Sequence, residues 1–226
     1  MTNPWMQLPK SAPFALPEEY ETLVAFNGIA DDNHKLQLDV LPEPFIGNPD
    51  APVVLLSLNP GFDKSDHHHH AREDFSGAIW RNLRHDVSDY PFYFLDPRFK
   101  DTGGAAWWLK KLRVLIEDTS LETVAQGLFC VEIFGYHSVN YRAIPKKIRK
   151  DPLPHQQYGF HLVRQAIERG AEIVVMRQQK NWLGHVPELE SYPIHNLRSP
   201  LNPAVSPGNL DSYDRIRDLI GGSKAH

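Results

Sequence analysis

Stretches of apolar residues without polar alternation divide the chain at 53–58, 128–133 and 172–176, and a shorter mixed run follows at 193–197. Short apolar runs of this kind are typical of strands buried on both faces. Apolar residues at helical spacing lie between and around them, at 18–27, 75–84, 103–116, 155–169 and 210–220. This alternation predicts an α/β fold, a three-layer α/β/α sandwich around a central, mainly parallel four-stranded sheet.

The first 17 residues differ from the rest of the chain. They contain four prolines and no periodicity, which predicts an extended N-terminal arm laid over the surface or partly disordered. Residues 18–226 contain no linker and no internal repeat. We therefore expect one arm (1–17) and a single domain (18–226).

Composition narrows the class of protein further. Apolar residues make up 41 % of the 226 residues and aromatic residues 11 %, which excludes a disordered or fibrous chain. Cys130 is the only cysteine, so no disulfide forms within the chain and a reducing compartment fits. No apolar run is long enough to span a bilayer, and no signal segment is visible. We expect a cytoplasmic monomer that has no membrane partner.

The motif Ser57-Leu58-Asn59-Pro60-Gly61-Phe62 ends the first apolar run. Pro60 bends the backbone, and Gly61 allows a ligand or another segment to come close. Asn59 is thereby predicted to lie at the carboxyl end of a central strand, where α/β sheets bind ligands. The alternative is an ordinary strand-to-loop turn.

A polar loop at 63–72 contains the run His67-His68-His69-His70. Neighbours in sequence rarely present three or four converging ligands, so we expect neither a metal site nor a cofactor here. Aromatic rings follow, with Phe75 in a helix and Phe92 in a loop at 89–99. Such rings either cap a core or stack on a nucleobase.

Two charged features complete the candidate chemistry. Glu132 is the one carboxylate in the second apolar run, and a carboxylate there requires a partner or a function. Residues 142–150 form the densest basic stretch of the chain and include Lys146 and Lys147. The stretch is either a solvated surface or a contact to phosphates. The formal net charge of −4 argues against a wholly electrostatic grip on nucleic acid but allows a local basic face.

A second motif, Ser199-Pro200-Leu201-Asn202-Pro203-Ala204-Val205, follows the fourth run. The pair of motifs, with a polar residue ending the strand between them, resembles the uracil-DNA glycosylase superfamily over roughly residues 45–219. Its single-strand-selective monofunctional and mismatch-specific branches are the most similar.

The resemblance implies a role for each matched position. Asn59 corresponds to the residue that orients the attacking water, and Glu132 stands where the family has an asparagine that reads the base. Further base-binding candidates are Gly61, Phe62, Phe75 and Phe92. The DNA-binding candidates are Ser199, Pro200, Lys146, Lys147, Ser206 and Gly208.

The family's catalytic histidine has no direct counterpart. An alignment on Ser199 and Pro200 puts that position on Leu197, and His195 would lie on the same side of the strand. An alignment on Asn202 instead matches the mismatch-specific variant, in which asparagine replaces the histidine. Both alternatives, His195 and Asn202, stay open.

The expected function is that of a monofunctional DNA glycosylase that flips out a base and hydrolyses its N-glycosidic bond. Ionised Glu132 would repel a carbonyl oxygen of uracil but accept from the amine of cytosine. We therefore expect a modified cytosine, as in the hypermodified DNA of some phages, which would give the protein a role in phage defence.

Four alternatives remain. They are a uracil or mismatch repair glycosylase, an inactive nucleic-acid-binding protein of the same fold, an unrelated α/β enzyme with a metal at 67–70, and a Glu132 that is merely paired with a nearby arginine or histidine.

Overall fold

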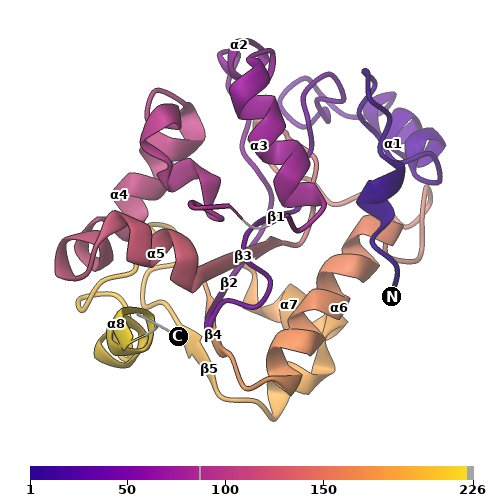
Figure 1. The fold of residues 1–226 in the computed structure, drawn as a ribbon. Coiled ribbons are helices and arrows are strands. Elements are labelled where there is room, and N and C mark those ends of the chain that lie inside the picture. The colour runs from indigo at the N-terminus through magenta and orange to yellow at the C-terminus, as the bar shows by residue number, and fades with distance from the viewer. Residues whose placement is uncertain (87, 223–226) are drawn as a thin grey trace.

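The computed structural model describes residues 1–86 and 88–222. Its centre is a five-stranded sheet in the order β1-β3-β2-β4-β5 (Figure 1). The strands are β1 (Phe45–Gly47), β2 (Val53–Ser57), β3 (Leu128–Glu132), β4 (Glu172–Val175) and β5 (Ile194–Asn196). Strands β2, β3, β4 and β5 run parallel to one another, and β1 runs antiparallel to β3.

The α/β class is confirmed, and the four expected strands are present within one residue of their expected bounds. The sheet is mixed and has a fifth strand, β1, which the sequence analysis missed. This strand has three residues and lies in a proline-rich stretch, so its apolar pattern is too short to recognise.

Strand β1 depends on one glycine and one asparagine. Gly47 has a φ of 107°, and a Cβ atom there would lie 2.3 Å from the carbonyl oxygen of Leu128, so only glycine fits. Asn82 of the neighbouring helix accepts from the Gly47 amide at 3.0 Å and donates to the Phe45 carbonyl at 2.6 Å. At the outer edge of the sheet, the Asn82 side chain thereby supplies hydrogen-bond partners for backbone groups of β1.

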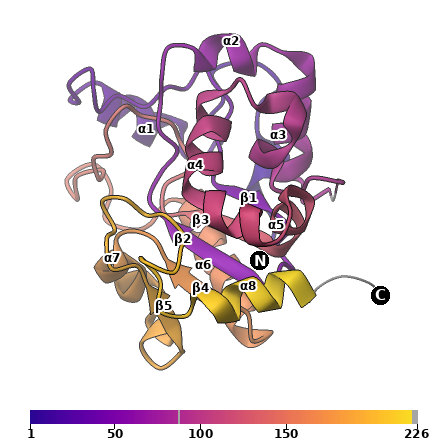
Figure 2. The same ribbon diagram turned by 90° about the vertical axis from the view of Figure 1, so that its left-hand side faces the viewer.

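Helices cover both faces of the sheet (Figures 1 and 2). Helix α6 packs against β3, with α7 beside it, and α8 packs against β2 on the face that α4 and α5 also cover. The α-helices are α1 (Tyr20–Asn27), α2 (Asp66–His70), α3 (Glu73–Leu83), α4 (Gly103–Asp118), α5 (Leu121–Gly127), α6 (Pro154–Glu168), α7 (Gln179–His185) and α8 (Tyr213–Gly222). Short 3-10 helices lie at Pro4–Gln7, Tyr93–Leu95, Pro97–Phe99 and Pro187–Glu190. None of the helices in the described parts of the chain is long and apolar enough to cross a bilayer.

Three helices were not expected. Helix α2 replaces the predicted polar loop, and α5 and α7 are short. Each contains few apolar residues, so tertiary packing decides its conformation more than hydrophobic periodicity does.

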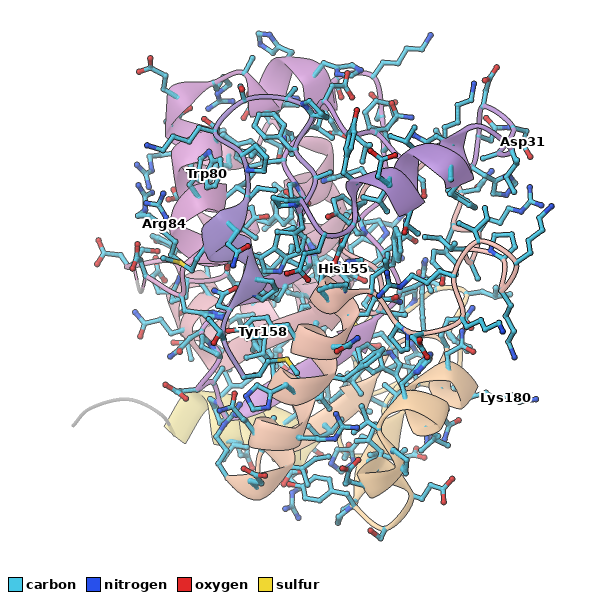
Figure 3. All side chains as sticks on the ribbon, turned by 90° about the vertical axis from the view of Figure 1, so that its right-hand side faces the viewer. Asp31, Trp80, Arg84, His155, Tyr158 and Lys180 are labelled. Carbon is cyan, nitrogen blue, oxygen red and sulfur yellow. The ribbon has the colours of Figure 1, made fainter. Side chains whose placement is uncertain are left out.

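The N-terminal segment, residues 1–17, is anchored to the rest of the molecule by a few buried side chains. Trp5 is 1 % exposed, and Leu8 and Leu16 are buried as well. Trp5 packs beside His155 of α6, with ring centroids 5.8 Å apart, and His155 is labelled on α6 in Figure 3. The segment is thus anchored to the core by Trp5, Leu8, Ala15 and Leu16, while most of its other residues are exposed at the surface.

Candidate active site

A pocket of about 440 Å³ opens beyond the carboxyl ends of β2 and β3. Strand pairing explains why its polar residues meet, since Ser57 is directly opposite Glu132 in the parallel register. Asn59 follows two residues after Ser57 and lines the same pocket. Of the residues predicted from the sequence, the pocket brings together Asn59, Gly61, Phe62, Phe75 and Glu132.

Hydrogen bonds fix the orientation of Asn59. Its Nδ2 atom donates to the Pro60 carbonyl at 2.8 Å and to Ser138 Oγ at 3.2 Å. Both protons of the amide are used within the protein, so Oδ1 is the atom offered to a bound molecule. An oxygen held in this way can accept a proton of a water molecule and orient it.

Glu132 is buried without adequate partners. It is 7 % exposed, and Oε2 has no hydrogen-bond partner in the described parts of the chain. Oε1 receives a long contact, 4.0 Å, from Cys130 Sγ. Burial raises the pKa of Glu132 to about 7, although a hydrogen bond from Ser57 and attraction to Arg177 oppose the rise. At neutral pH the carboxyl group is therefore divided between its ionised and protonated forms.

The predicted aromatic residues have different positions. Phe62 is half-buried at the pocket, where its ring lies edge-on to His67. Phe75 is 1 % exposed and contacts the rings of His70 and Phe99. Phe92 is fully buried against Trp108 and lies outside the pocket lining. The expected base contact of Phe92 is therefore wrong, because this ring serves the core.

The pocket lining also includes His70, from the histidine run, together with Glu43 and His137, which the sequence analysis did not select as site residues. One ligating atom from each lies within 4.8 Å of the others. His137 Nδ1 donates to the Gly61 carbonyl at 2.6 Å, and His137 Nε2 lies 3.6 Å from Glu43 Oε2. Two imidazoles and a carboxylate have the chemistry of a divalent metal site, so this group requires a closer test of its protonation.

Burial is the largest influence on the pKa values of Glu43 and His70 in this cluster. It raises the pKa of Glu43 to about 8, against a 2.8 Å hydrogen bond from Tyr93 that favours the ionised form. Burial, and then repulsion from neighbouring histidines, lowers the pKa of His70 to about 2. The sequence signals for this cluster were the histidine run that ends at His70 and the position of Glu43 between Pro42 and Pro44, since a carboxylate in an otherwise apolar stretch needs a partner.

The second motif lies beside the pocket and not in its lining. Its loop is organised by Asn209, which donates to the carbonyls of Asn202 and Ala204 at 3.2 and 2.9 Å and accepts from the Ser199 amide at 2.7 Å. Asn202 Oδ1 accepts from Lys111 Nζ at 2.5 Å. Asn202 is therefore engaged outside the pocket, and its expected catalytic role has no support from this contact.

The loop approaches the pocket rim through α4. Lys111 lies 5.5 Å above the ring of Trp107, and Trp107 lines the pocket. The predicted DNA-binding residues of this region are exposed or half-buried, and they are Ser199, Pro200, Ser206 and Gly208. Leu201 at the tip is 94 % exposed.

His195 lies away from the pocket, contrary to its expected catalytic role. His195 Nε2 is 2.5 Å from Glu172 Oε2, and Arg215 of α8 also pairs with Glu172. Glu172 is the first residue of β4, so this cluster lies toward the amino ends of the strands. His195 therefore belongs to an ion-pair cluster, and its position does not support the expected role in excision.

Lys146 and Lys147 are exposed in the segment that leaves the pocket wall at Tyr141. Neither side chain has an ion-pair partner within residues 1–86 and 88–222. Both ammonium groups are thus available to an external anion.

Comparison of the chain with protein-family models, with curated proteins and with solved structures gave no match. The resemblance to the uracil-DNA glycosylase superfamily rests on the sequence motifs alone.

Proposed function

We propose that this protein is a metal-free, monofunctional DNA glycosylase of the uracil-DNA glycosylase kind, with a modified cytosine as its substrate base. The observation that carries the proposal is that Asn59 of the first motif and Glu132 of the second apolar run line one pocket at the carboxyl ends of β2 and β3. Asn59 orients the water, and Glu132 reads the base.

The ionised form of Glu132 favours cytosine over uracil, whereas the protonated form can pair with either base. With a pKa of about 7, the protonated carboxyl accepts from the exocyclic amine and donates to the ring nitrogen of cytosine. The ionised form would turn an oxygen toward the carbonyl oxygen of uracil. The pocket of about 440 Å³ has room for a single ring with a substituent.

Features around the pocket support a nucleic-acid substrate. Lys146 and Lys147 are free to contact phosphates. The exposed tip residue Leu201 has the character of the apolar wedges that enter a base stack. A base that leaves the stack would enter the pocket, and the wedge would fill the gap.

The test uses oligonucleotides that each contain one altered base, followed by alkaline cleavage at the resulting abasic site. Wild-type protein should excise a 5-substituted cytosine faster than uracil. Asn59→Ala should lower excision by about a hundredfold, the usual effect of removing one positioned polar group, and Glu132→Asn should shift the preference toward uracil. Faster excision of uracil by the wild type would refute the assignment of the base, and no excision of any base would refute the glycosylase.

A further inference from the structure

Lys111 of α4 is a buried ammonium group that the proposed chemistry does not use. The residue is 8 % exposed, and no carboxylate pairs with it within residues 1–86 and 88–222. Its Nζ atom makes one hydrogen bond in the described parts of the chain, the 2.5 Å bond to Asn202 Oδ1. A lysine on a helix usually extends its charge into water. Here the ammonium is turned inward toward a neutral amide, which costs free energy, so the group requires an explanation beyond packing.

Both ends of Lys111 hold one loop of the second motif, residues 199–205, which we call the wedge loop. The backbone carbonyl of Lys111 accepts from the Val205 amide at 2.9 Å, and the ammonium group holds the side chain of Asn202. Figure 2 shows the loop beside α4. Leu201, which is 94 % exposed, directly precedes Asn202. The position of the exposed leucine therefore depends on Lys111.

The same ammonium group also contacts the wall of the pocket. It lies 5.5 Å from the ring centroid of Trp107, one helical turn earlier on α4, and Trp107 lines the pocket. The guanidinium group of Arg177, another pocket residue, lies 5.9 Å from the same ring. Lys111 is thus a direct link between the pocket wall and the wedge loop.

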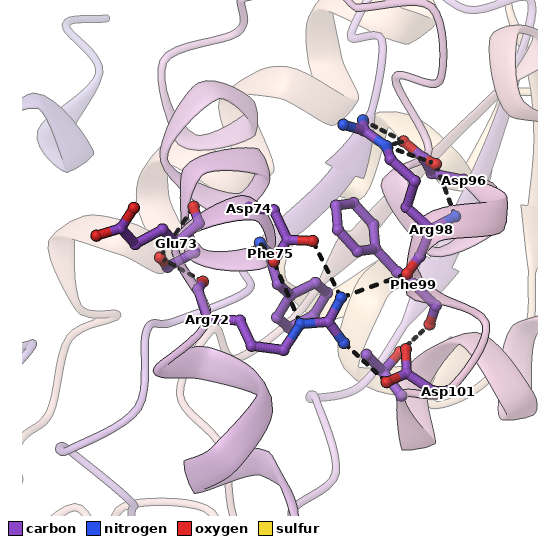
Figure 4. Close-up of polar contacts among 10 residues, drawn as sticks. Arg72, Glu73, Asp74, Phe75, Asp96, Arg98, Phe99 and Asp101 are labelled. Carbon is purple, nitrogen blue, oxygen red and sulfur yellow. Dashed lines mark hydrogen bonds and ion pairs between the residues drawn. The ribbon is translucent and has the colours of Figure 1, made fainter.

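Helix α4 gives Lys111 a fixed base. Asp101, two residues before α4, accepts from Arg72 at 2.8 Å, and Arg72 also donates to Asp74 of α3 at 3.0 Å (Figure 4). The start of α4 is thereby joined to the start of α3. The wedge loop, by contrast, contains neither a helix nor a strand, so its position depends on contacts to such rigid elements.

We propose that Lys111 is the positioning residue of the wedge loop, and that its bond to Asn202 holds Leu201 ready to fill the gap left in a duplex by a flipped base. The inference rests on the proposed glycosylase. A base in a single strand has no pairing to break, so an apolar wedge is needed only in a duplex. Lys111 therefore governs how well the enzyme acts on paired DNA, whereas Asn59 and the water serve the bond-breaking step on either substrate.

Base flipping, measured without excision, tests this role independently of catalysis. The probe is a duplex with 2-aminopurine beside 5-hydroxymethylcytosine, and its fluorescence rises when the neighbouring base leaves the stack. In the Asn59→Ala background, saturating protein should raise the fluorescence. Adding Lys111→Met should lower the equilibrium for flipping about tenfold, because one hydrogen bond to a charged group is lost.

Lys110→Met is the matched control, because it makes the same substitution at the exposed neighbour of Lys111. It should leave the fluorescence rise unchanged. An equal rise with Lys111→Met, or no rise with Lys111 intact, would overturn the proposal.

Single-turnover excision from paired and single-stranded DNA supplies the second readout, on whichever base the wild type removes. Lys111→Met should slow excision from the duplex about tenfold, and excision from a single strand of the same sequence should change by less than about twofold. Equal slowing on both substrates would show that Lys111 serves only the fold, and full activity on the duplex would also overturn the proposal. A wild type that excises nothing would refute the glycosylase, and the fluorescence comparison would still decide the role of Lys111.

A double-mutant cycle connects the effect to the bond with Asn202. Asn202→Ala should reproduce the loss on duplex DNA, and the double variant Lys111→Met with Asn202→Ala should be no slower than either single variant. Asn202→Asp keeps an oxygen that accepts from the ammonium group and should retain excision from the duplex. Additive losses in the double variant, or a loss in Asn202→Asp equal to that in Asn202→Ala, would show that the bond does not position the loop.

Discussion

Glu19 and Glu132 are both buried carboxylates, yet their surroundings are opposite. Glu19 is 0 % exposed and accepts from Tyr136 Oη at 2.7 Å, from the His155 amide at 2.7 Å and from His155 Nδ1 at 2.8 Å. Glu132 is 7 % exposed and has an oxygen with no partner in the described parts of the chain. Equal burial thus produces one satisfied carboxylate and one unsatisfied carboxylate.

The two environments move the pKa in opposite directions. Burial alone would raise the pKa of Glu19, but attraction to His155 and the hydrogen bonds from His155 and Tyr136 lower it below its ordinary value. At Glu132 the opposing contacts are too weak, and burial raises the pKa to about 7. Burial therefore does not mark a functional carboxylate. A buried carboxylate at the wall of a pocket that keeps one oxygen without a partner is the better candidate for a functional group.

Glutamine substitutions at Glu19 and Glu132 test this difference between the two carboxylates. The largest effect on the free energy of unfolding is expected at Glu19. Glu19→Gln replaces an acceptor oxygen with an NH₂ group that faces donors, and it leaves His155 without its anion. Removing one member of a buried pair typically costs about 3–5 kcal/mol. Urea unfolding at pH 7 should show that loss, and Glu18→Gln, at the exposed neighbour, should stay near the wild type. A loss equal to that of Glu18→Gln would show that the network contributes little.

Glu132→Gln should have a smaller effect of the opposite sign, and it should depend on pH. The folded pKa of about 7 exceeds the ordinary 4.5, so the folded state retains a proton that the unfolded chain releases. The contribution of Glu132 to stability is therefore full below about pH 4.5 and is lost as pH rises through 7, a change of about 3 kcal/mol. The variant lacks this loss, so its stability relative to the wild type should rise between pH 5 and pH 8. Urea unfolding at both pH values measures the change, and a pH-independent difference would contradict the raised pKa.

The local sequence pattern indicated Glu132 as a candidate site residue but gave no indication of the role of Glu19. Glu132 was visible in the sequence because it ends an apolar run, and Asn59 because a proline and a glycine follow it. Glu19 gave no signal, since its partners Tyr136 and His155 are more than a hundred residues away. Contacts of that range arise only when α6 and the N-terminal segment pack together.

The pocket residues likewise fall into two groups, those that the sequence pattern indicated and those that it did not. Strands of continuous apolar residues placed Asn59 and Glu132 at one edge of the sheet, because parallel strands end together. His70 and Glu43 reach the pocket from α2 and from the segment before β1, which local periodicity did not reveal. His195 was misplaced because strand alternation assigns a face of the sheet but not the end at which the partners of a side chain lie.

The cluster of His195, Glu172 and Arg215 contains a further carboxylate with partners. There we expect the smallest effect on the free energy of unfolding. Glu172 keeps Arg215 as a partner when His195 is removed, so its charge stays compensated. The side chains of His195 and Glu172 are 18 % and 11 % exposed, and solvent screens part of their interaction. His195→Ala should therefore cost only about 1–2 kcal/mol in urea unfolding, near the value of one charged hydrogen bond. Excision should stay within about twofold of the wild type, whereas Asn59→Ala, measured beside it, should fall by about a hundredfold. A large loss of excision in a folded His195→Ala protein would show that His195 takes part in catalysis. It would also mean that a carboxylate with all its partners can belong to a functional site, which contradicts the distinction drawn between Glu132 and Glu19.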